Sequence, residues 1–131
     1  MDFVLMLHSI VRWIIVIVAL AAIVRFVLIW AGKAQGSNMD RGLMSGFSGL
    51  LDLQVLLGLI YLVWNGLSGT GFPLYRLEHA FTMIVAVVIA HMSIRWKNAE
   101  APIRARNNLV AIVASSVLIF IGVAIVGGWV K

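Results

Sequence analysis

Four long apolar runs, separated by three shorter polar segments, dominate the sequence. The first run covers residues 3–30, and the later runs cover residues 46–65, 74–96 and 109–130. A helix rises about 1.5 Å per residue, so runs of about 20 residues or more are long enough to cross the roughly 30 Å hydrocarbon core of a bilayer. The pattern therefore predicts an all-α fold: an integral membrane four-helix up-down bundle that forms a single domain over residues 1–131.

The first apolar run is too long to be a cleavable signal. As a helix, residues 3–30 reach about 40 Å, so the ends of this helix should enter the headgroup layers or the helix should tilt. No basic segment precedes the run, its length exceeds the roughly 15 apolar residues of a signal peptide, and no Ala-x-Ala cleavage site follows. We expect this helix to stay in the mature protein.

Turn-forming and charged residues mark the segments between the runs. Residues 32–45 mix glycines with charged and amide side chains, and residues 66–72 contain three glycines. Both segments are expected to be loops. Pro73 then suits the first turn of the third helix, because the N–H that proline lacks would be unpaired there anyway. The third segment, 97–108, is expected to be a basic loop.

The polar end of that third loop offers a helix cap. Asn107 or Asn108 precedes the last apolar run, and asparagine is a preferred residue at a helix N-terminus. The last helix is therefore predicted to begin at about residue 109.

Composition supports a membrane protein and removes several classes of function. The 131 residues are 63% hydrophobic and 11% charged, with a mean hydropathy of +1.06, whereas soluble domains carry about a quarter charged residues. The chain has no cysteine, which excludes disulfides, iron–sulfur clusters and covalently attached c-type haem. No Walker, Rossmann, nucleophile-elbow or metalloprotease pattern occurs, so we expect no enzyme, and at most an electron-transfer subunit of one.

The formal net charge of +5 is a topology signal in this chain, and we expect no nucleic-acid partner. The second segment is followed by Arg76, which Glu78 balances. By the positive-inside rule, the first and third segments should face the cytoplasm across a bacterial inner membrane, and both termini should lie on the non-cytoplasmic side. The basic residues in or beside those two segments are Lys33, Arg41, Arg95, Lys97, Arg104 and Arg106.

Two histidines are expected at one depth in the bundle. His8 lies near the start of the first run and His79 near the start of the third. These two helices run parallel in an up-down bundle, so the imidazoles can reach one another. Axial ligation of a b-type haem requires two such histidines, one on each side of the iron. Arg12 lies one turn from His8 and Arg76 about one turn from His79, and either could pair with the haem propionates.

A structural interpretation of the same residues stays open. A histidine near the headgroups costs little, and an ion pair between Arg12 and Glu78 would clamp two helices without any cofactor. Ionisable residues within membrane spans are nevertheless rare and often functional.

A second polar set is expected toward the other end of the bundle. Arg25 lies late in the first run, Asp52 and Gln54 lie early in the second, and His91 lies late in the third. We expect an Arg25–Asp52 ion pair, extended by His91, that fixes the register of the helices. A proton path or a site for a quinone headgroup is the functional alternative.

Three short motifs carry a resemblance to a known family. The motifs are His8-Ser9-x-x-Arg12-Trp13, Leu53-Gln54-x-x-x-Gly58-x-x-Tyr61 and Glu78-His79-x-x-x-Met83. In their order and spacing, over essentially the whole chain, the sequence resembles a family of small bacterial four-helix membrane proteins often labelled "cytochrome b". The resemblance implies a four-helix membrane protein that binds haem b, with His8 and His79 in the motif positions.

The sequence departs from that family at two places. Asp52 stands where the family tends to carry a histidine before Leu-Gln, and the last run lacks the Pro-Trp ending that the family often shows. The departure at Asp52 argues against a haem on the cytoplasmic side and leaves the pair of His8 and His79 intact.

Two hypotheses for function follow. In the first, the chain is a small integral membrane subunit of a bacterial respiratory or photosynthetic electron-transfer complex, a b-type cytochrome with one haem between His8 and His79. In the second, it is a cofactor-free accessory subunit that stabilises a larger complex through the small residues of the last run, which let helix backbones approach closely. In both, the partners are the lipid bilayer and other membrane subunits.

Overall fold

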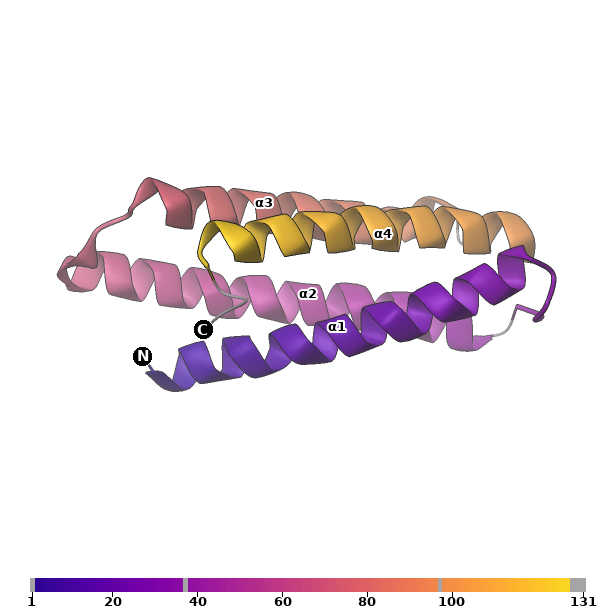
Figure 1. The fold of residues 1–131 in the computed structure, drawn as a ribbon, viewed down its shortest axis with the longest axis horizontal. Helices are drawn as coiled ribbons and strands as arrows, with labels where there is room; N and C mark the ends of the chain where they lie inside the picture. Colours follow the sequence, from indigo (N-terminus) through magenta and orange to yellow (C-terminus); the bar gives the residue numbers. More distant parts are fainter. Residues whose placement is uncertain (1, 37, 97, 128–131) are drawn as a thin grey trace.

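The chain folds into four long helices that run up and down beside one another (Figure 1). The computed structural model describes residues 2–36, 38–96 and 98–127. Within those residues there is no strand, and each helix packs against two others: α1 and α3 both pack against α2 and against α4. The predicted all-α four-helix bundle is confirmed. The helices are α1 (Asp2–Trp30), α2 (Asn38–Asn65), α3 (Leu74–His91) and α4 (Ala101–Ile125).

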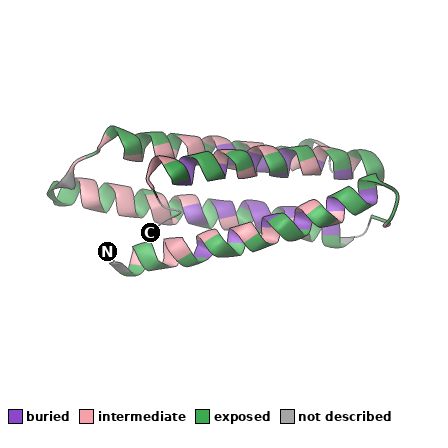
Figure 2. Ribbon diagram, viewed as in Figure 1, coloured by how far each residue is buried: buried purple, intermediate pink, exposed green. Residues whose placement is uncertain are grey.

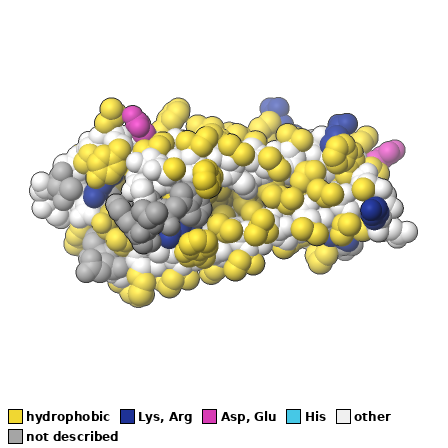
Figure 3. All heavy atoms as spheres, in the orientation of Figure 1, with side chains coloured by type: hydrophobic (Ala, Val, Ile, Leu, Met, Phe, Trp, Pro, Cys, Tyr) yellow, Lys and Arg dark blue, Asp and Glu magenta, His cyan; other side chains and the backbone are white. Residues whose placement is uncertain are grey.

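All four helices are long and apolar enough to cross a bilayer. Hydrophobic side chains cover most of the face in Figure 3, and the charged side chains visible there lie mainly toward the two ends of the bundle. By length and composition this is a multi-pass membrane protein, as predicted. The candidate spans are Phe3–Trp30, Met39–Gly69, Leu74–Trp96 and Ala101–Ile125.

Two helices begin earlier than predicted. Helix α2 begins at Asn38 instead of about residue 46, and α4 begins at Ala101 instead of about residue 109. The hydropathy pattern marks where lipid begins, whereas backbone hydrogen bonds decide where a helix begins, so both helices continue through polar residues. Helix α4 ends at Ile125, and the predicted end of the last run at residue 130 lies outside the described residues.

The predicted asparagine cap of α4 is wrong. Glu100 occupies the N-cap position, and Pro102 lies in the first turn of the helix, where its missing N–H is tolerated. Asn108 lies inside the helix instead, is buried, and accepts a hydrogen bond of 2.6 Å from Trp96 Nε1.

Short helical segments shape the connections. A single wide turn, η1 (Gly66–Thr70), follows α2 and is interrupted by Gly69, whose φ of 110° lies in the left-handed region that favours glycine. Pro73 is the N-cap of α3, so it lies just before the first turn and not within it as predicted. A 3₁₀ segment, η2 (Met92–Trp96), extends α3.

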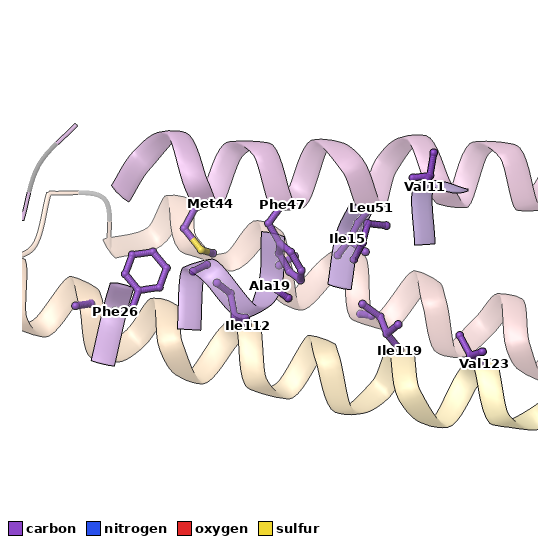
Figure 4. Close-up of a cluster of buried hydrophobic side chains, with 14 of the residues drawn as sticks. Val11, Ile15, Ala19, Phe26, Met44, Phe47, Leu51, Ile112, Ile119 and Val123 are labelled. Carbon is purple, nitrogen blue, oxygen red and sulfur yellow. The ribbon is translucent and has the colours of Figure 1, made fainter. Parts of the chain in front are cut away.

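The buried core lies mainly toward the end of the bundle that carries the α1–α2 and α3–α4 connections (Figure 2). Phe26 of α1, Phe47 of α2 and Ile112 of α4 are fully buried there. Figure 4 shows these side chains pointing inward from three helices, with Val11 and Val123 farther along the bundle. Tight packing at this end fixes how the helices sit relative to one another.

The small residues of α4 are used inside this bundle. Ala111, Ser115 and Gly122 are buried, and the Ser115 hydroxyl donates a hydrogen bond of 3.1 Å to the backbone oxygen of Ala86 in α3. A Cβ at Gly122 would collide with Met83 of α3. These residues therefore bring α4 close to α3. Because they are buried within the bundle, they are not available to contact another subunit, as the hypothesis of a cofactor-free accessory subunit required.

Candidate functional site

His8 and His79 come together across the diagonal of the bundle. His8 lies in α1 and His79 in α3, and the centres of their rings are 6.5 Å apart, with an angle of 52° between the ring planes. The two helices start at the same end of the bundle (Figure 1). The structure thus brings the two predicted histidines within reach of a shared ligand.

The ring of His79 is oriented by α4. Its Nδ1 lies 2.6 Å from the backbone oxygen of Gly122. A carbonyl oxygen can only accept, so Nδ1 carries the proton and the lone pair is left on Nε2. Histidines that bind metals are usually held in this way, with the second nitrogen donating to a carbonyl or carboxylate. The buried contact of Gly122 with α3 is what places this carbonyl.

The ring of His8 is oriented by α2. The amide nitrogen of Gln54 donates a hydrogen bond of 2.8 Å to the backbone oxygen of His8 and lies 3.3 Å from His8 Nδ1. The amide oxygen of Gln54 is buried without a partner. An amide N–H only donates, so in this arrangement Nδ1 of His8 accepts and the ring proton is on Nε2. The Nε2 lone pair of His8 would become available if the amide flipped by half a turn and its oxygen accepted from Nδ1–H, at the expense of the bond to the His8 backbone oxygen.

Gly58 gives the His8 ring its space. A Cβ at Gly58 would lie 3.2 Å from His8 Nε2, closer than ordinary van der Waals contact. Gly58 follows Gln54 by one turn, so both lie on the face of α2 that meets His8. The motif Gln54-x-x-x-Gly58 was visible in the sequence, but Gln54 was grouped with Asp52, and the shared face that this i, i+4 spacing creates was not used to place Gln54 beside His8.

All four helices line a cavity at the two histidines. Its volume is about 370 Å³, within the range of small-molecule sites. Both histidines, Gln54 and Gly58 line it, and apolar side chains from the four helices make up most of the rest. The cavity is therefore an apolar chamber with a few polar groups on its wall.

Two arginines add positive charge to this wall. Arg12 and Arg76 both line the cavity, whereas the described lining residues include no Asp or Glu. Arg76 lies over the rings of Tyr61 and Tyr75, at 5.7 and 5.9 Å from their centres, and its buried Nη1 has no hydrogen-bond partner. A buried guanidinium nitrogen with no acceptor is costly in an apolar site, so the cavity favours a ligand that carries an anionic group.

The proposed clamp between Arg12 and Glu78 is not formed. The Glu78 side chain is exposed and does not line the cavity. Ion pairs among the described residues join other partners. The guanidinium of Arg12 lies 5.3 Å from the centre of the Trp13 ring.

The predicted Arg25–Asp52 pair is also wrong. Arg25 Nε lies 2.9 Å from Asp40 Oδ1, and its Nη2 donates to the backbone oxygen of Gln35 at 2.6 Å. Asp40 was assigned to a loop, but because α2 begins at Asn38 this carboxylate lies in a helix, buried and level with Arg25.

Asp52 instead pairs with His91, the residue expected to extend that pair. His91 Nε2 lies 2.8 Å from Asp52 Oδ1, and both side chains are about half exposed. The contact joins α2 to the end of α3, away from the cavity.

Searches against protein-family models, curated proteins and solved structures found no match to this chain. Within the described ranges no group of three or more His, Cys, Asp or Glu residues is arranged to hold a metal ion. The functional argument therefore depends on the geometry of the cavity itself.

Proposed function

We propose that this chain is a small b-type cytochrome subunit that holds one haem between His8 and His79. The arrangement of these two rings is the observation that carries the proposal. An imidazole nitrogen binds a metal at about 2 Å, so two rings on opposite sides of one ion have centres roughly 6 Å apart. The measured 6.5 Å agrees with that spacing.

The surroundings of the rings support the same ligand. Each Nδ1 has a neighbour that can orient it, Gly122 for His79 and Gln54 for His8. Nε2 of His79 carries the lone pair that an iron would take, and Nε2 of His8 would carry one after the Gln54 amide flips its oxygen toward Nδ1. Arg76, with Arg12 on the same wall, provides the positive charge that two propionates require. A haem b would supply the uptake and release of one electron.

The chain's own part is to orient, neutralise and exclude water. The Gly122 carbonyl holds the His79 ring, Gln54 and Gly58 hold the His8 ring, and apolar side chains that make up most of the lining would limit water around the haem. We propose that the chain does this as a subunit of a respiratory or photosynthetic electron-transfer complex, since a one-electron carrier in a membrane needs a donor and an acceptor.

The absorption spectrum of the purified protein tests this function. Protein made in a haem-supplied bacterial host and solubilised in mild detergent should show a Soret band that shifts on reduction with dithionite. His8→Ala and His79→Ala should each remove the low-spin spectrum. His91→Ala, a histidine away from the cavity, is the matched control and should keep it. A wild-type protein without the band would overturn the proposal and favour the cofactor-free accessory subunit.

We further propose that the cavity end faces the non-cytoplasmic side of a bacterial inner membrane. The described loop between α1 and α2 carries Lys33, and Arg95 and Arg104 flank the connection between α3 and α4, which supports this orientation by the positive-inside rule. A reporter enzyme that is active only outside the cytoplasm should be active when it is fused after Lys131. Cytoplasmic activity of that fusion would reverse the assignment.

A further inference from the structure

The two histidines of the cavity carry their ring protons on different nitrogens. His79 Nδ1 lies 2.6 Å from the backbone oxygen of Gly122, which can only accept, so its proton is on Nδ1 and its lone pair on Nε2. His8 Nδ1 lies 3.3 Å from the amide nitrogen of Gln54, which only donates, so its lone pair is on Nδ1 and its proton on Nε2. The Nε2 atom of His79 is therefore an acceptor, and that of His8 is a donor.

The orientation of the Gln54 amide is set by the backbone of α1. The amide nitrogen lies 2.8 Å from the backbone oxygen of His8, and a carbonyl oxygen needs a donor as its neighbour. Exchanging the nitrogen and oxygen of the amide would set two oxygen atoms against one another. Only 9% of Gln54 is exposed, so water is a poor substitute for the lost hydrogen bond.

This difference makes the two histidines unequal as metal ligands. A metal takes a ring nitrogen with a free lone pair, while the other nitrogen donates to an acceptor. His79 already meets both conditions. The Nδ1 lone pair of His8 is occupied by Gln54, and its Nε2 becomes free only when Gln54 gives up its bond to the His8 backbone oxygen. Losing one hydrogen bond should weaken His8 as a ligand about fivefold.

The packing around the two rings differs in the same sense. Residues 3–10 of α1 are all exposed or half-buried, and the first buried side chain of that helix among the described residues is Val11. His8 thus lies on a loosely packed segment, and such segments move most easily. Gly122, which holds His79, is buried.

We propose that His8 is the exchangeable ligand of this site, controlled by Gln54, and that a small neutral molecule such as a diatomic gas binds in its place opposite His79. This inference rests on the proposed haem. When His8 leaves, its ring stays neutral: the proton moves from Nδ1 to Nε2, Gln54 regains its hydrogen bonds, and no electron is transferred. The Nε2–H group can then donate to the bound molecule. Donors at that position help to decide whether a haem site binds gases or only carries electrons.

Carbon monoxide tests the exchange on the haem-loaded protein reduced with dithionite. Carbon monoxide should shift the Soret band of the wild-type protein. Gln54→Glu puts an acceptor beside Nδ1–H and so keeps Nε2 of His8 on the iron, which should lower the affinity for carbon monoxide about tenfold. Gln35→Glu, at an exposed glutamine in the α1–α2 connection, is the matched control and should behave like the wild type.

The two proposals fail in different ways in this experiment. A Soret band that carbon monoxide does not shift would overturn the exchange alone. A protein without a Soret band would overturn the proposed function and the exchange with it. Equal carbon monoxide affinities of the wild type and Gln54→Glu would show that Gln54 does not control His8.

The tautomer of His8 in the haem-free protein gives a second readout, which needs no cofactor. Nitrogen NMR of the histidine-labelled protein should place the ring proton on Nε2 of His8 and on Nδ1 of His79. Gln54→Met keeps a side chain of similar size but removes the donor, so His8 should lose its preference while His79 keeps its own. A wild-type His8 protonated on Nδ1, or an unchanged tautomer in Gln54→Met, would overturn the proposal.

Discussion

The two ends of this bundle are built differently. Toward the α1–α2 and α3–α4 connections, which we call the filled end, the side chains of Phe26, Phe47 and Ile112 are fully buried between the helices. At the opposite end, around His8 and His79, the four helices line a cavity of about 370 Å³. Figure 2 shows the buried residues concentrated along the first of these regions and largely missing from the second half of α2.

This difference suggests a division of roles, in which the filled end stabilises the bundle and the hollow end is the candidate functional site. Membrane helices associate through close packing and interhelical hydrogen bonds, because lipid is as apolar as their side chains. The filled end provides that packing and fixes the helix directions, which lets the other end stay hollow. The polar groups follow the same division: Arg25 and Asp40 satisfy one another, whereas Arg76 and Gln54 each keep a buried polar atom without a partner.

The largest effect on stability is expected from emptying the filled end. Phe47→Ala removes a ring that is fully buried, and the void should lower the free energy of unfolding by about 3 kcal/mol. Leu62→Ala, which only enlarges the existing cavity, is the matched control and should cost much less. Unfolding in SDS, followed by circular dichroism, measures both. Equal losses of unfolding free energy in the two variants would contradict the difference in packing between the two ends of the bundle.

A smaller effect is expected from the ion pair at the filled end. Asp40→Ala leaves Arg25 without its carboxylate, which in a fully buried pair costs several kcal/mol. Here the Arg25 side chain is 20% exposed and can extend toward water, so we expect a loss of about 2 kcal/mol. Asp52→Ala is the comparison, and under the same SDS titration its half-exposed pair should matter less. The opposite ranking would contradict the burial argument.

The smallest effect on free energy is expected at the hollow end. Gly58→Ala adds a methyl group 3.2 Å from His8 Nε2 and should displace this ring. If His8 is a haem ligand as proposed, displacing it should weaken haem binding about tenfold, measured by haem titration of the purified protein, with little change in the free energy of unfolding. Gly42→Ala places its methyl group in open space and should leave haem binding unchanged. Equal haem affinities of the two variants would show that Gly58 does not help to position His8.

Much of this architecture is predictable from the sequence because it depends on local properties. Runs of apolar residues long enough to span lipid identify the four helices, and their alternating direction places His8 and His79 at the same end. The helix starts were misplaced because Asp40 and Asn108 are polar residues inside helices, where the hydropathy pattern indicated loops.

The choice of partners could not be predicted in the same way. Arg25 pairs with Asp40 and Asp52 with His91, although depth alone also allowed Arg25 with Asp52. A hydrogen bond requires atoms within about 3 Å, and a shift of one residue rotates a side chain by about 100° around the helix. Depth along the bundle is encoded locally, but rotation about each helix axis is set by packing against its neighbours.

Sequence alone therefore determined that this is a four-helix membrane protein with two histidines near one end. The tertiary structure decided that the Gly122 carbonyl and Gln54 orient those histidines, that Arg76 faces the cavity, and that Glu78 does not. The physical reason is that these contacts join residues far apart in the chain. Their geometry exists only after the filled end has fixed the tilt and rotation of all four helices.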